Sequence, residues 1–185
     1  MPSIFITGPV RSGKSRFAER LARERVGEVT YAATARADPD DPEWAERIAR
    51  HAARRPPHWR LVETAAPSSP SLEELCRDAP EGTTLVVDSL GTWLAAQMTP
   101  EIAAIALEDR AQGLVEAVLA TRALAIVVGE EVGWGIVPPY PSGRLFRDVL
   151  GRAQQRLAAR SGQAYLVVAG FALDLRRHGL PVDPQ

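Results

Sequence analysis

Residues 8–15 read GPVRSGKS, which fits the phosphate-loop pattern G-x-x-x-x-G-K-[ST]. A short apolar run at residues 3–7 comes before it, and residues 15–25 after it carry apolar side chains at helical spacing. The stretch therefore has the order of strand, loop and helix that the pattern requires. Glycines let backbone N–H groups turn toward phosphate oxygens, and the start of a helix adds partial positive charge. We expect Lys14 to reach the β- and γ-phosphates of a nucleoside triphosphate and Ser15 to offer its hydroxyl to Mg²⁺.

Lys14 differs from every other basic residue of the chain. The sequence has 22 lysine and arginine residues, and Lys14 is the only lysine among them. A compact ammonium cannot be replaced by a wide, planar guanidinium where space is tight. The sequence therefore indicates that position 14 requires the chemistry of lysine.

The rest of the chain alternates between predicted strands and helices. Apolar runs predict strands at residues 29–33, 58–63, 84–87, 124–128 and 164–169, the last of them being the final strand. Helices are predicted over residues 42–54 after an Asp41 N-cap, after the Ser71 and Glu74 capping box, from Thr99 onward with Ile105 on its buried side, and over residues 142–160. This order predicts an α/β fold with a mostly parallel sheet and helices on both faces. We expect one nucleotide-binding domain over residues 1–185, with a frayed tail from about residue 174.

Composition limits the classes of protein to which the chain can belong. With 185 residues, 45% of them hydrophobic and 24% charged, it has the balance of one soluble globular domain. Cys76 is the only cysteine, so no internal disulfide can form, and a reducing, cytoplasmic setting is expected. No apolar run is long enough to cross a bilayer, so we expect no membrane insertion. A net charge of −1 provides no general attraction for nucleic acid, and a polyanion must be held locally.

Asp88 follows the apolar, β-branched run at residues 84–87. Phosphate-loop enzymes hold Mg²⁺ with a second acidic residue, directly or through water. The sequence therefore favours Asp88 as a metal residue beside Ser15. The alternative is an aspartate that caps the following turn.

Residues 47–60 concentrate positive charge, with five arginines, two histidines and no acidic residue. If this segment is helical, Trp44, Ile48 and His51 share one face. A neutral imidazole among guanidinium groups is kept from protonating, which leaves a ring nitrogen free to act as a nucleophile on a bound phosphate. The alternatives are a packing histidine for His51, and a solvated face or a nucleic-acid patch for the arginines.

Several blocks of sequence, in a fixed order, carry a resemblance to a known family. They read GPVRSGKS at residues 8–15, RIARH at 47–51, RPPHWR at 55–60, EVGWGIVP at 131–138, FRD at 146–148 and QRLA at 155–158. Together they resemble the bifunctional adenosylcobinamide kinase/adenosylcobinamide-phosphate guanylyltransferase family of cobalamin biosynthesis. The resemblance implies a phosphate-loop NTPase with a RecA-like sheet that assembles as a homotrimer.

The resemblance also implies two reactions on a corrinoid substrate. A nucleoside triphosphate, ATP or GTP, phosphorylates the aminopropanol hydroxyl of adenosylcobinamide, and GMP is then transferred from GTP to that phosphate with release of pyrophosphate. The transfer is implied to pass through a covalent GMP-histidine, and the matching residue is His51. Attack at the α-phosphate needs a nucleophile outside the phosphate loop, because that loop orients the β- and γ-phosphates.

Catalytic roles are thus expected for His51 and Lys14, and metal roles for Ser15 and Asp88. The nucleotide-binding residues that the resemblance implies are Gly8, Pro9, Val10, Arg11, Ser12, Gly13, Lys14, Ser15, Thr34, Ala35, Arg36, Ala52, Ala53, Arg54, Arg55, Glu63 and Asp88. Two of them depart from the family pattern. Asp88 stands where relatives carry glutamate, and Pro9 replaces a glycine and so removes one N–H donor.

Other interpretations remain open at this point. A simple small-molecule kinase would use the phosphate loop without covalent chemistry at His51, and a RecA-like binding module would use the arginines to hold nucleic acid. Residues 130–135, with two glutamates and two glycines after a strand, are either a substrate loop or an ordinary connection. Arg152, Arg156 and Arg160 form a helical stripe that we expect at solvent or at a subunit contact. The sequence does not identify the group that takes the proton of the aminopropanol hydroxyl.

Overall fold

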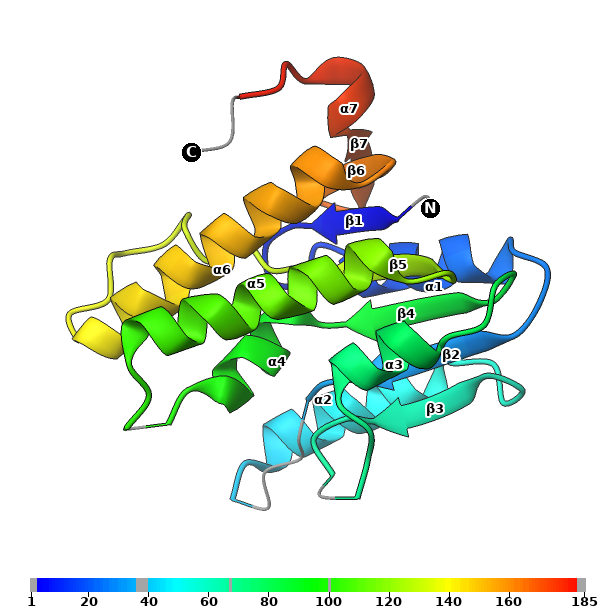
Figure 1. Ribbon diagram of the computed structural model, residues 1–185, viewed down its shortest axis with the longest axis horizontal. Helices are drawn as coiled ribbons and strands as arrows, with labels where there is room; N and C mark the ends of the chain where they lie inside the picture. The colour runs from blue at the N-terminus through cyan, green and yellow to red at the C-terminus, as the bar shows by residue number, and fades with distance from the viewer. Residues whose placement is uncertain (1–2, 36–39, 67, 100, 183–185) are drawn as a thin grey trace.

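A twisted sheet with helices on both faces forms the molecule (Figure 1). The computed structural model describes residues 3–35, 40–66, 68–99 and 101–182, without the side chain of residue 47. Within these ranges, seven strands form one sheet in the order β3-β2-β4-β5-β1-β6-β7. The strands are β1 (Ile4–Thr7), β2 (Val29–Ala33), β3 (Arg60–Glu63), β4 (Thr84–Asp88), β5 (Leu124–Val128), β6 (Gln163–Val168) and β7 (Phe171–Asp174). All neighbouring strands pair in parallel except β6 and β7, which confirms a mostly parallel sheet.

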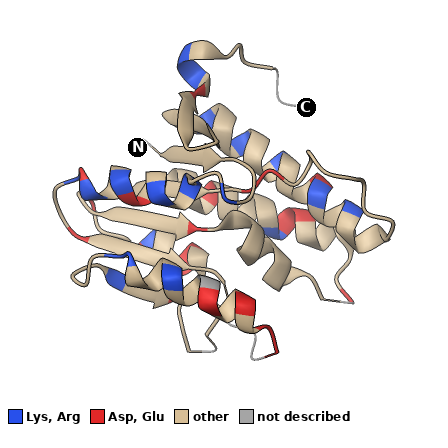
Figure 2. Ribbon diagram, turned by 180° about the vertical axis from the view of Figure 1, so that it is seen from behind, with Lys and Arg blue, Asp and Glu red and all other residues tan. Residues whose placement is uncertain are grey.

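Two apolar layers attach the helices to the sheet. The helices are α1 (Lys14–Arg23), α2 (Pro42–Ala53), α3 (Leu72–Asp78), α4 (Leu90–Gln97), α5 (Ala104–Ala120), α6 (Pro141–Arg160) and α7 (Leu175–His178). Buried side chains of α3, α4, α5 and α6 pack against one face in a single cluster (Figure 1). On the opposite face, Ala18 and Ala22 of α1 pack with Ile4, Tyr31 and Ile126, and α1 and α2 lie in front of the sheet in Figure 2.

The strand order brings four connections together. The strand β5 pairs with both β4 and β1, and β4 pairs also with β2. The segments that follow β1, β2, β4 and β5 therefore leave the sheet at the same edge, at the carboxyl ends of the parallel strands. Open α/β sheets bind their ligands at this edge.

Local sequence signals set the predicted start of two helices. The Asp41 carboxylate accepts a hydrogen bond from the backbone N–H of Trp44 at 2.9 Å, and Pro42 occupies the first helical position of α2. At α3, Ser71 and Glu74 form the reciprocal hydrogen bonds of a capping box. Both predicted caps are confirmed.

The segment after β4 differs from the prediction of a helix that begins at Thr99. A separate helix, α4, follows β4 at once, and α5 begins only at Ala104. Ser89 and Thr92 close a capping box at the start of α4, and this explains the early start. Ile105 is 74% exposed, so its predicted burial is wrong; Leu107 and Ala111 face the core instead.

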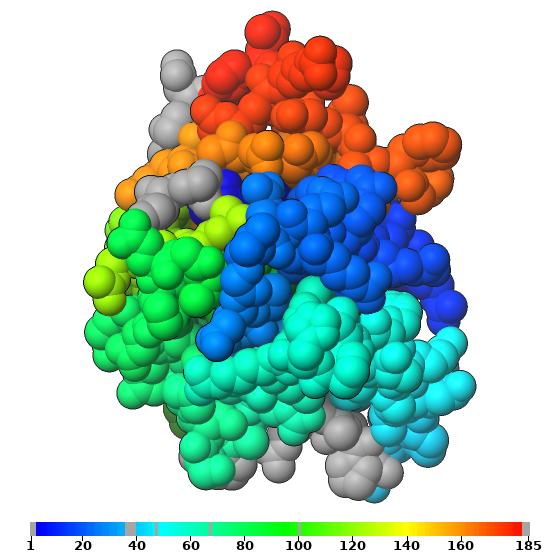
Figure 3. Space-filling model, turned by 90° about the vertical axis from the view of Figure 1, so that its right-hand side faces the viewer, coloured from blue at the N-terminus to red at the C-terminus, as the bar shows by residue number. Residues whose placement is uncertain are grey.

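The C-terminal region is more ordered than predicted. The strand β6 is not the last one, because Ala169 and Gly170, both with positive φ, turn the chain into the antiparallel strand β7. Within the predicted frayed tail, α7 follows β7, and Arg176 donates hydrogen bonds to the carbonyls of Ala158, Ala159 and Ser161 at the end of α6. Residues 179–182 are exposed and belong to no helix or strand, so fraying beyond α7 stays a prediction. The C-terminal residues, orange to red in Figure 3, gather at one end of the molecule.

Candidate active site

The phosphate loop joins β1 to α1 and needs glycine at two positions. Gly13 has a φ of 101°, a left-handed conformation that only glycine adopts without strain, and it forms the N-cap of α1. At Gly8, an added Cβ would collide with the carbonyl oxygen of Val167 in β6. Ser12 is buried, and its Oγ has no hydrogen-bond partner among the described residues. The loop thus presents an unsatisfied hydroxyl and a helix N-terminus, both suited to a phosphate group.

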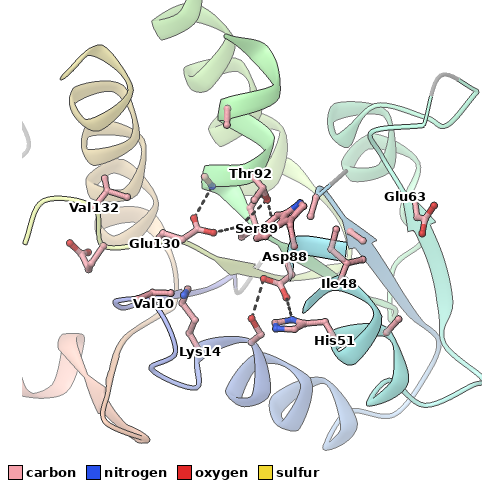
Figure 4. Close-up of a pocket in the computed structure, with 18 of the residues that line it drawn as sticks. Val10, Lys14, Ile48, His51, Glu63, Asp88, Ser89, Thr92, Glu130 and Val132 are labelled. Atoms are coloured by element: carbon pink, nitrogen blue, oxygen red, sulfur yellow. Dashed lines mark hydrogen bonds and ion pairs between the residues drawn. The ribbon is translucent and has the colours of Figure 1, made fainter. Parts of the chain in front are cut away.

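Lys14 is 7% exposed and begins α1. Its Nζ donates a hydrogen bond to the Pro9 carbonyl at 3.3 Å, so the ammonium folds back over the loop. Figure 4 shows the side chain pointing from the loop toward the end of β5. This is the region in which the phosphates of a nucleotide would lie.

Asp88, at the end of β4, is the hub of the polar contacts (Figure 4). Its Oδ1 accepts a hydrogen bond from Ser15 Oγ at 3.3 Å, and its Oδ2 accepts one from the Tyr31 hydroxyl. Burial and the Asp88 carboxylate raise the pKa of Tyr31 above its ordinary value, which keeps the phenol protonated as a donor.

Ser15 and Asp88 together can hold a magnesium ion. A hydroxyl oxygen and carboxylate oxygens adjacent to the phosphate loop are hard ligands of the kind that Mg²⁺ prefers, with phosphate oxygens and waters completing its shell. Within the described ranges, no group of three or more His, Cys, Asp and Glu side chains could hold a metal ion. The arrangement therefore suits Mg²⁺ bound together with a nucleotide rather than a metal held by protein side chains alone.

His51 lies in the last turn of α2 and faces Asp88 (Figure 4). Its Nδ1 is 4.0 Å from Asp88 Oδ2. The sequence interpretation placed only guanidinium groups around this ring, and it omitted this carboxylate. The charges next to the imidazole are therefore of both signs.

Two cavities meet at His51, Lys14 and Ser15, which line both of them. The larger has a volume of about 400 Å³ and extends from α2 to the loop after β5. Trp44, Ile48 and His51 line it together, as the predicted common face requires. The expected nucleotide-binding residues that line it are Val10, Lys14, Ser15, Ala35, Ala52, Arg55, Glu63 and Asp88, and the expected catalytic residue His51 lines it as well.

The smaller cavity, of about 230 Å³, is strongly basic. It lies between the phosphate loop and α2, and Figure 2 shows basic residues along both α1 and α2. None of the described residues that line it is acidic. Its lining residues are Arg11, Ser12, Gly13, Lys14, Ser15, Arg16, Arg50, His51 and Arg54.

Arg54 and Arg55 follow the end of α2 and contact different elements. Arg54 forms an ion pair with the buried Glu19 of α1 at 3.3 Å, and this holds the end of α2 against α1. The Arg55 guanidinium lies 4.1 Å from the centre of the Tyr31 ring. The Nε atoms of both arginines are buried without a hydrogen-bond partner among the described residues. Each therefore retains donor capacity beside a cavity.

Of the remaining expected residues, Gly8, Pro9, Thr34 and Ala53 line neither of the two cavities. Gly8 and Pro9 shape the phosphate loop, and Ala53 is exposed. The Thr34 hydroxyl donates to the Ser89 carbonyl at 2.7 Å and accepts from the Ser89 N–H at 2.6 Å, so it ties the end of β2 to the end of β4. Arg36 lies outside the described residues.

Sequence reasoning missed the polar contacts at the start of α4. The Ser89 hydroxyl donates to Glu130 Oε1, and the Gly91 N–H donates to Glu130 Oε2 at 2.8 Å. Ser89, Thr92 and Glu130 all line the larger cavity. The signal that could have revealed this site is the Ser89-x-x-Thr92 spacing directly after a strand, which marks a helix start.

The loop from Glu131 to Gly135 is anchored at several points. Glu131 Oε1 accepts a hydrogen bond from the Thr7 hydroxyl at 2.9 Å, and Arg147 donates to the carbonyls of Gly133 and Ile136. Glu131 lines the larger cavity, so part of this loop borders the site. Its predicted role in binding substrate stays a prediction.

The predicted arginine stripe of α6 pairs with α5 within the chain. Arg152 and Arg156 both form ion pairs with Glu108, and Arg160 forms one with Glu116. These contacts occupy the guanidinium groups far along α6 from the phosphate loop.

None of the described helices combines the length and apolar character that a bilayer span requires.

Comparison with solved structures identifies the fold. An ATPase from the type III secretion system of pathogenic bacteria matches with a TM-score of 0.56 at 11% identity, over 97% of this chain and 58% of the other. A protein of Pyrococcus horikoshii OT3 matches with a TM-score of 0.53 at 7% identity, over 99% and 92% of the two chains. With the sheet order and the phosphate loop, these likenesses confirm a phosphate-loop NTPase fold with a RecA-like sheet.

Comparison with known sequences identifies the family. The model of a family described as "Cobinamide kinase / cobinamide phosphate guanyltransferase" matches residues 4–175. The "Bifunctional adenosylcobalamin biosynthesis protein CobU" of Salmonella typhimurium is 38% identical over 94% of this chain and 99% of its own length. The corresponding CobP protein of Pseudomonas aeruginosa is 37% identical over 92% and 95% of the two lengths. The chain therefore belongs to the cobinamide kinase/cobinamide phosphate guanyltransferase family.

Proposed function

We propose that the protein phosphorylates adenosylcobinamide with a nucleoside triphosphate and then transfers GMP from GTP to adenosylcobinamide phosphate through a GMP-histidine at His51. One observation carries this proposal: His51 shares both cavities with Lys14 and Ser15 of the phosphate loop. A nucleophile for the α-phosphate and a cradle for the β- and γ-phosphates thus lie within one site, as the two reactions require.

In the kinase step, the phosphate loop orients the γ-phosphate for attack by the aminopropanol hydroxyl. The helix N-terminus and the Ser12 hydroxyl bind phosphate oxygens, and Lys14 exchanges its contact with Pro9 for the β- and γ-phosphates. Ser15 and Asp88 are the proposed magnesium residues. A magnesium ion held by these two residues would neutralise part of the negative charge of the phosphates.

In the guanylyl transfer, the His51 imidazole attacks the α-phosphorus, the N–P bond forms, and the bond to the departing pyrophosphate breaks. The Asp88 carboxylate faces Nδ1, which favours the tautomer with its proton on that nitrogen and the lone pair on Nε2. The 4.0 Å separation is long for a hydrogen bond, and such contacts tighten when substrate binds. The phosphate of adenosylcobinamide phosphate then attacks the phosphorus and restores the free imidazole.

The arginines of the smaller cavity stabilise the negative charge that develops during this transfer. Arg50 lies next to His51 in the last turn of α2, Arg54 follows the end of that helix, and Arg11 comes from the phosphate loop. Guanidinium groups bind phosphate oxygens through charge-assisted hydrogen bonds. This arrangement supports their assignment to the triphosphate.

The part of the larger cavity beside α2 is the proposed nucleoside site. Ala35, Ala52 and Arg55 supply apolar surface and a guanidinium, and Glu63 supplies a carboxylate at the end of β3. A carboxylate can accept hydrogen bonds from the N–H groups of guanine. We propose GTP as the guanylyl donor, and either ATP or GTP as the phosphoryl donor.

We further propose a cytoplasmic homotrimer. The single cysteine supports a reducing compartment. Assembly is supported by the edge strand β7, on which Phe171 is 81% exposed and Leu173 is 48% exposed. Light scattering of the purified protein would give three times the 20.1 kDa mass of the chain, and a monomer would contradict the trimer.

Product analysis tests the two reactions together. Purified protein is incubated with adenosylcobinamide, Mg²⁺ and either ATP alone or ATP with GTP, and the corrinoids are separated by chromatography. We expect adenosylcobinamide phosphate in the first case and adenosylcobinamide-GDP in the second. The His51→Ala variant should stop at adenosylcobinamide phosphate. A wild-type protein that also stops there would be a simple kinase and would contradict the transfer.

A further inference from the structure

Half of the larger cavity is not used by the proposed nucleotide site. Gly91, Thr92 and Ala95 line it from the start of α4, Glu130 and Val132 from the segment after β5, and Phe146 from α6. In phosphoryl transfer, the attacking and leaving oxygens lie roughly in line on opposite sides of the γ-phosphorus. The acceptor hydroxyl must therefore approach from the side away from the nucleoside. This unused half, opposite α2, is the side on which it would lie.

Glu130 is held in this half by contacts from several elements. Both of its carboxylate oxygens accept hydrogen bonds, one from the Ser89 hydroxyl and one from the Gly91 N–H at 2.8 Å. Its backbone carbonyl accepts a hydrogen bond from Gln154 Nε2 of α6 at 3.1 Å. The carboxylate is thus fixed at the N-terminus of α4, facing the cavity into which Lys14 points (Figure 4).

The charges that act on Glu130 come from two elements. The Lys14 ammonium approaches from α1, and the Asp88 carboxylate approaches from β4. Burial raises the pKa of Glu130 above its ordinary value, although its two hydrogen bonds and Lys14 act in the opposite direction. The carboxylate is therefore a stronger base than an exposed glutamate.

The other carboxylates that line the cavity have different partners. Glu131 is bound to the Thr7 hydroxyl at the end of β1. Asp88 contacts Ser15 and Tyr31 and faces His51. Glu63 lies at the end of β3, on the nucleoside side. Glu130 is the carboxylate that combines a fixed position with a place in the unused half.

We propose that Glu130 is the catalytic base of the kinase step, and that it takes the proton of the acceptor hydroxyl. As the hydroxyl oxygen attacks, its bond to the γ-phosphorus forms and the bond from that phosphorus to the β–γ bridging oxygen breaks. The nucleoside diphosphate leaves with the electron pair, the hydroxyl proton passes to the Glu130 carboxylate, and from there to solvent. This inference rests on the proposed function, because it requires a hydroxyl acceptor.

The test compares the two reactions in the Glu130→Gln variant. The phosphorylation of adenosylcobinamide should lose about 10²- to 10⁴-fold in kcat, which is the usual contribution of a general base. Guanylyl transfer to supplied adenosylcobinamide phosphate should be retained. In that reaction the attacking group is an ionised phosphate oxygen, so no hydroxyl proton has to be removed. Retained transfer also shows that the variant is folded.

Glu81→Gln is the control, because it removes an exposed carboxylate that precedes β4, at the opposite end of that strand from Asp88, and should leave the kinase step nearly unchanged. In Glu130→Ala, added formate should restore part of the kinase activity, as a small carboxylate can enter the vacated space. Equal loss of both reactions would assign Glu130 a structural role and overturn the proposal. Unchanged phosphorylation by Glu130→Gln would overturn it as well, while leaving the proposed function intact. A wild-type protein that makes no adenosylcobinamide phosphate would overturn both.

Discussion

The two cavities that meet at His51 differ in charge and in the elements that build them. The smaller is lined by the phosphate loop and by arginines of α1 and α2, with no acidic residue among the described residues that line it. The larger adds four carboxylates and apolar side chains from α2, α4 and α6. In the proposed function, the first stabilises phosphate charge, whereas the less charged nucleoside and acceptor occupy the second. The His51 imidazole, at the boundary, can therefore attack the α-phosphorus of a nucleotide whose phosphates lie in the smaller cavity and whose nucleoside lies in the larger one.

Lys14 borders both cavities, so its removal should damage both reactions most severely. We expect Lys14→Ala to lower kcat/KM of phosphorylation and of guanylyl transfer by about 10²- to 10³-fold, the effect of losing one preorganised charge donor. Steady-state kinetics of the two reactions measure this. Lys14→Arg should recover little, because the site is buried and a guanidinium is wider. If Lys14→Ala lost only one of the two reactions, Lys14 would act in that reaction alone, and this would contradict the prediction.

Arg50 belongs to the smaller cavity alone. Arg50→Ala should slow guanylylation of His51 by roughly tenfold, since one charge-assisted contact to the triphosphate is lost. A rapid-quench measurement with GTP labelled at the α-phosphate gives this rate. Arg152→Ala is the control, because that arginine pairs with Glu108 on the other side of the sheet. Similar slowing in both variants would point to a general charge effect and contradict a specific contact.

Gly91 lines the larger cavity alone. A substitution at this position can therefore affect one reaction more than the other without removing a charged side chain. A Cβ at this position would collide with the Glu130 carboxylate, whose flexible end must then move. We expect Gly91→Ala to lower the kinase rate several-fold, with smaller effects on His51 labelling, because misplacing a catalytic group is costly. Gly113→Ala is a control in α5, where no atom within 4 Å would meet the added Cβ. If Gly91→Ala lowered the rate of His51 labelling as much as the kinase rate, the two cavities would not serve different parts of the two reactions.

The smallest expected effect is a pH dependence of stability. Burial raises the pKa of Glu130 above its ordinary value of 4.5. Between that value and the raised one, the folded protein retains a proton that the unfolded chain releases, so the free energy of unfolding falls as pH rises through this window. Urea unfolding at a series of pH values should show this fall in the wild type and a weaker one in Glu130→Gln. A constant difference between the two proteins would show that Glu130 titrates normally.

Local patterns in the sequence predicted the parts of the fold that rest on neighbouring residues. The strands at residues 29–33 and 124–128, the Asp41 cap and the phosphate loop all follow from short-range signals. The start of α4 was missed because its sequence, LGTWLAAQ, has no polar face and lacks helical periodicity. The strand β7 was missed because its two-residue turn uses Ala169, a residue uncommon at positive φ.

The long-range contacts of the site could not be derived from spacing. Glu130 meets Ser89 only because β5 pairs with β4, and Asp88 meets His51 only because α2 packs near the end of β4. The sequence placed His51 among arginines but gave no position for the carboxylate that faces its Nδ1. Strand order and helix placement, rather than local composition, decide these contacts.

Trapping the nucleotidyl group on the protein tests whether His51 carries GMP during the transfer. The wild type is incubated with GTP labelled at the α-phosphate and no corrinoid, then denatured and digested. We expect an acid-labile, alkali-stable label on the peptide that contains His51, and this label should disappear when adenosylcobinamide phosphate is added before denaturation. A protein without this label, or a His51→Ala variant that makes adenosylcobinamide-GDP at the wild-type rate, would contradict this role of His51.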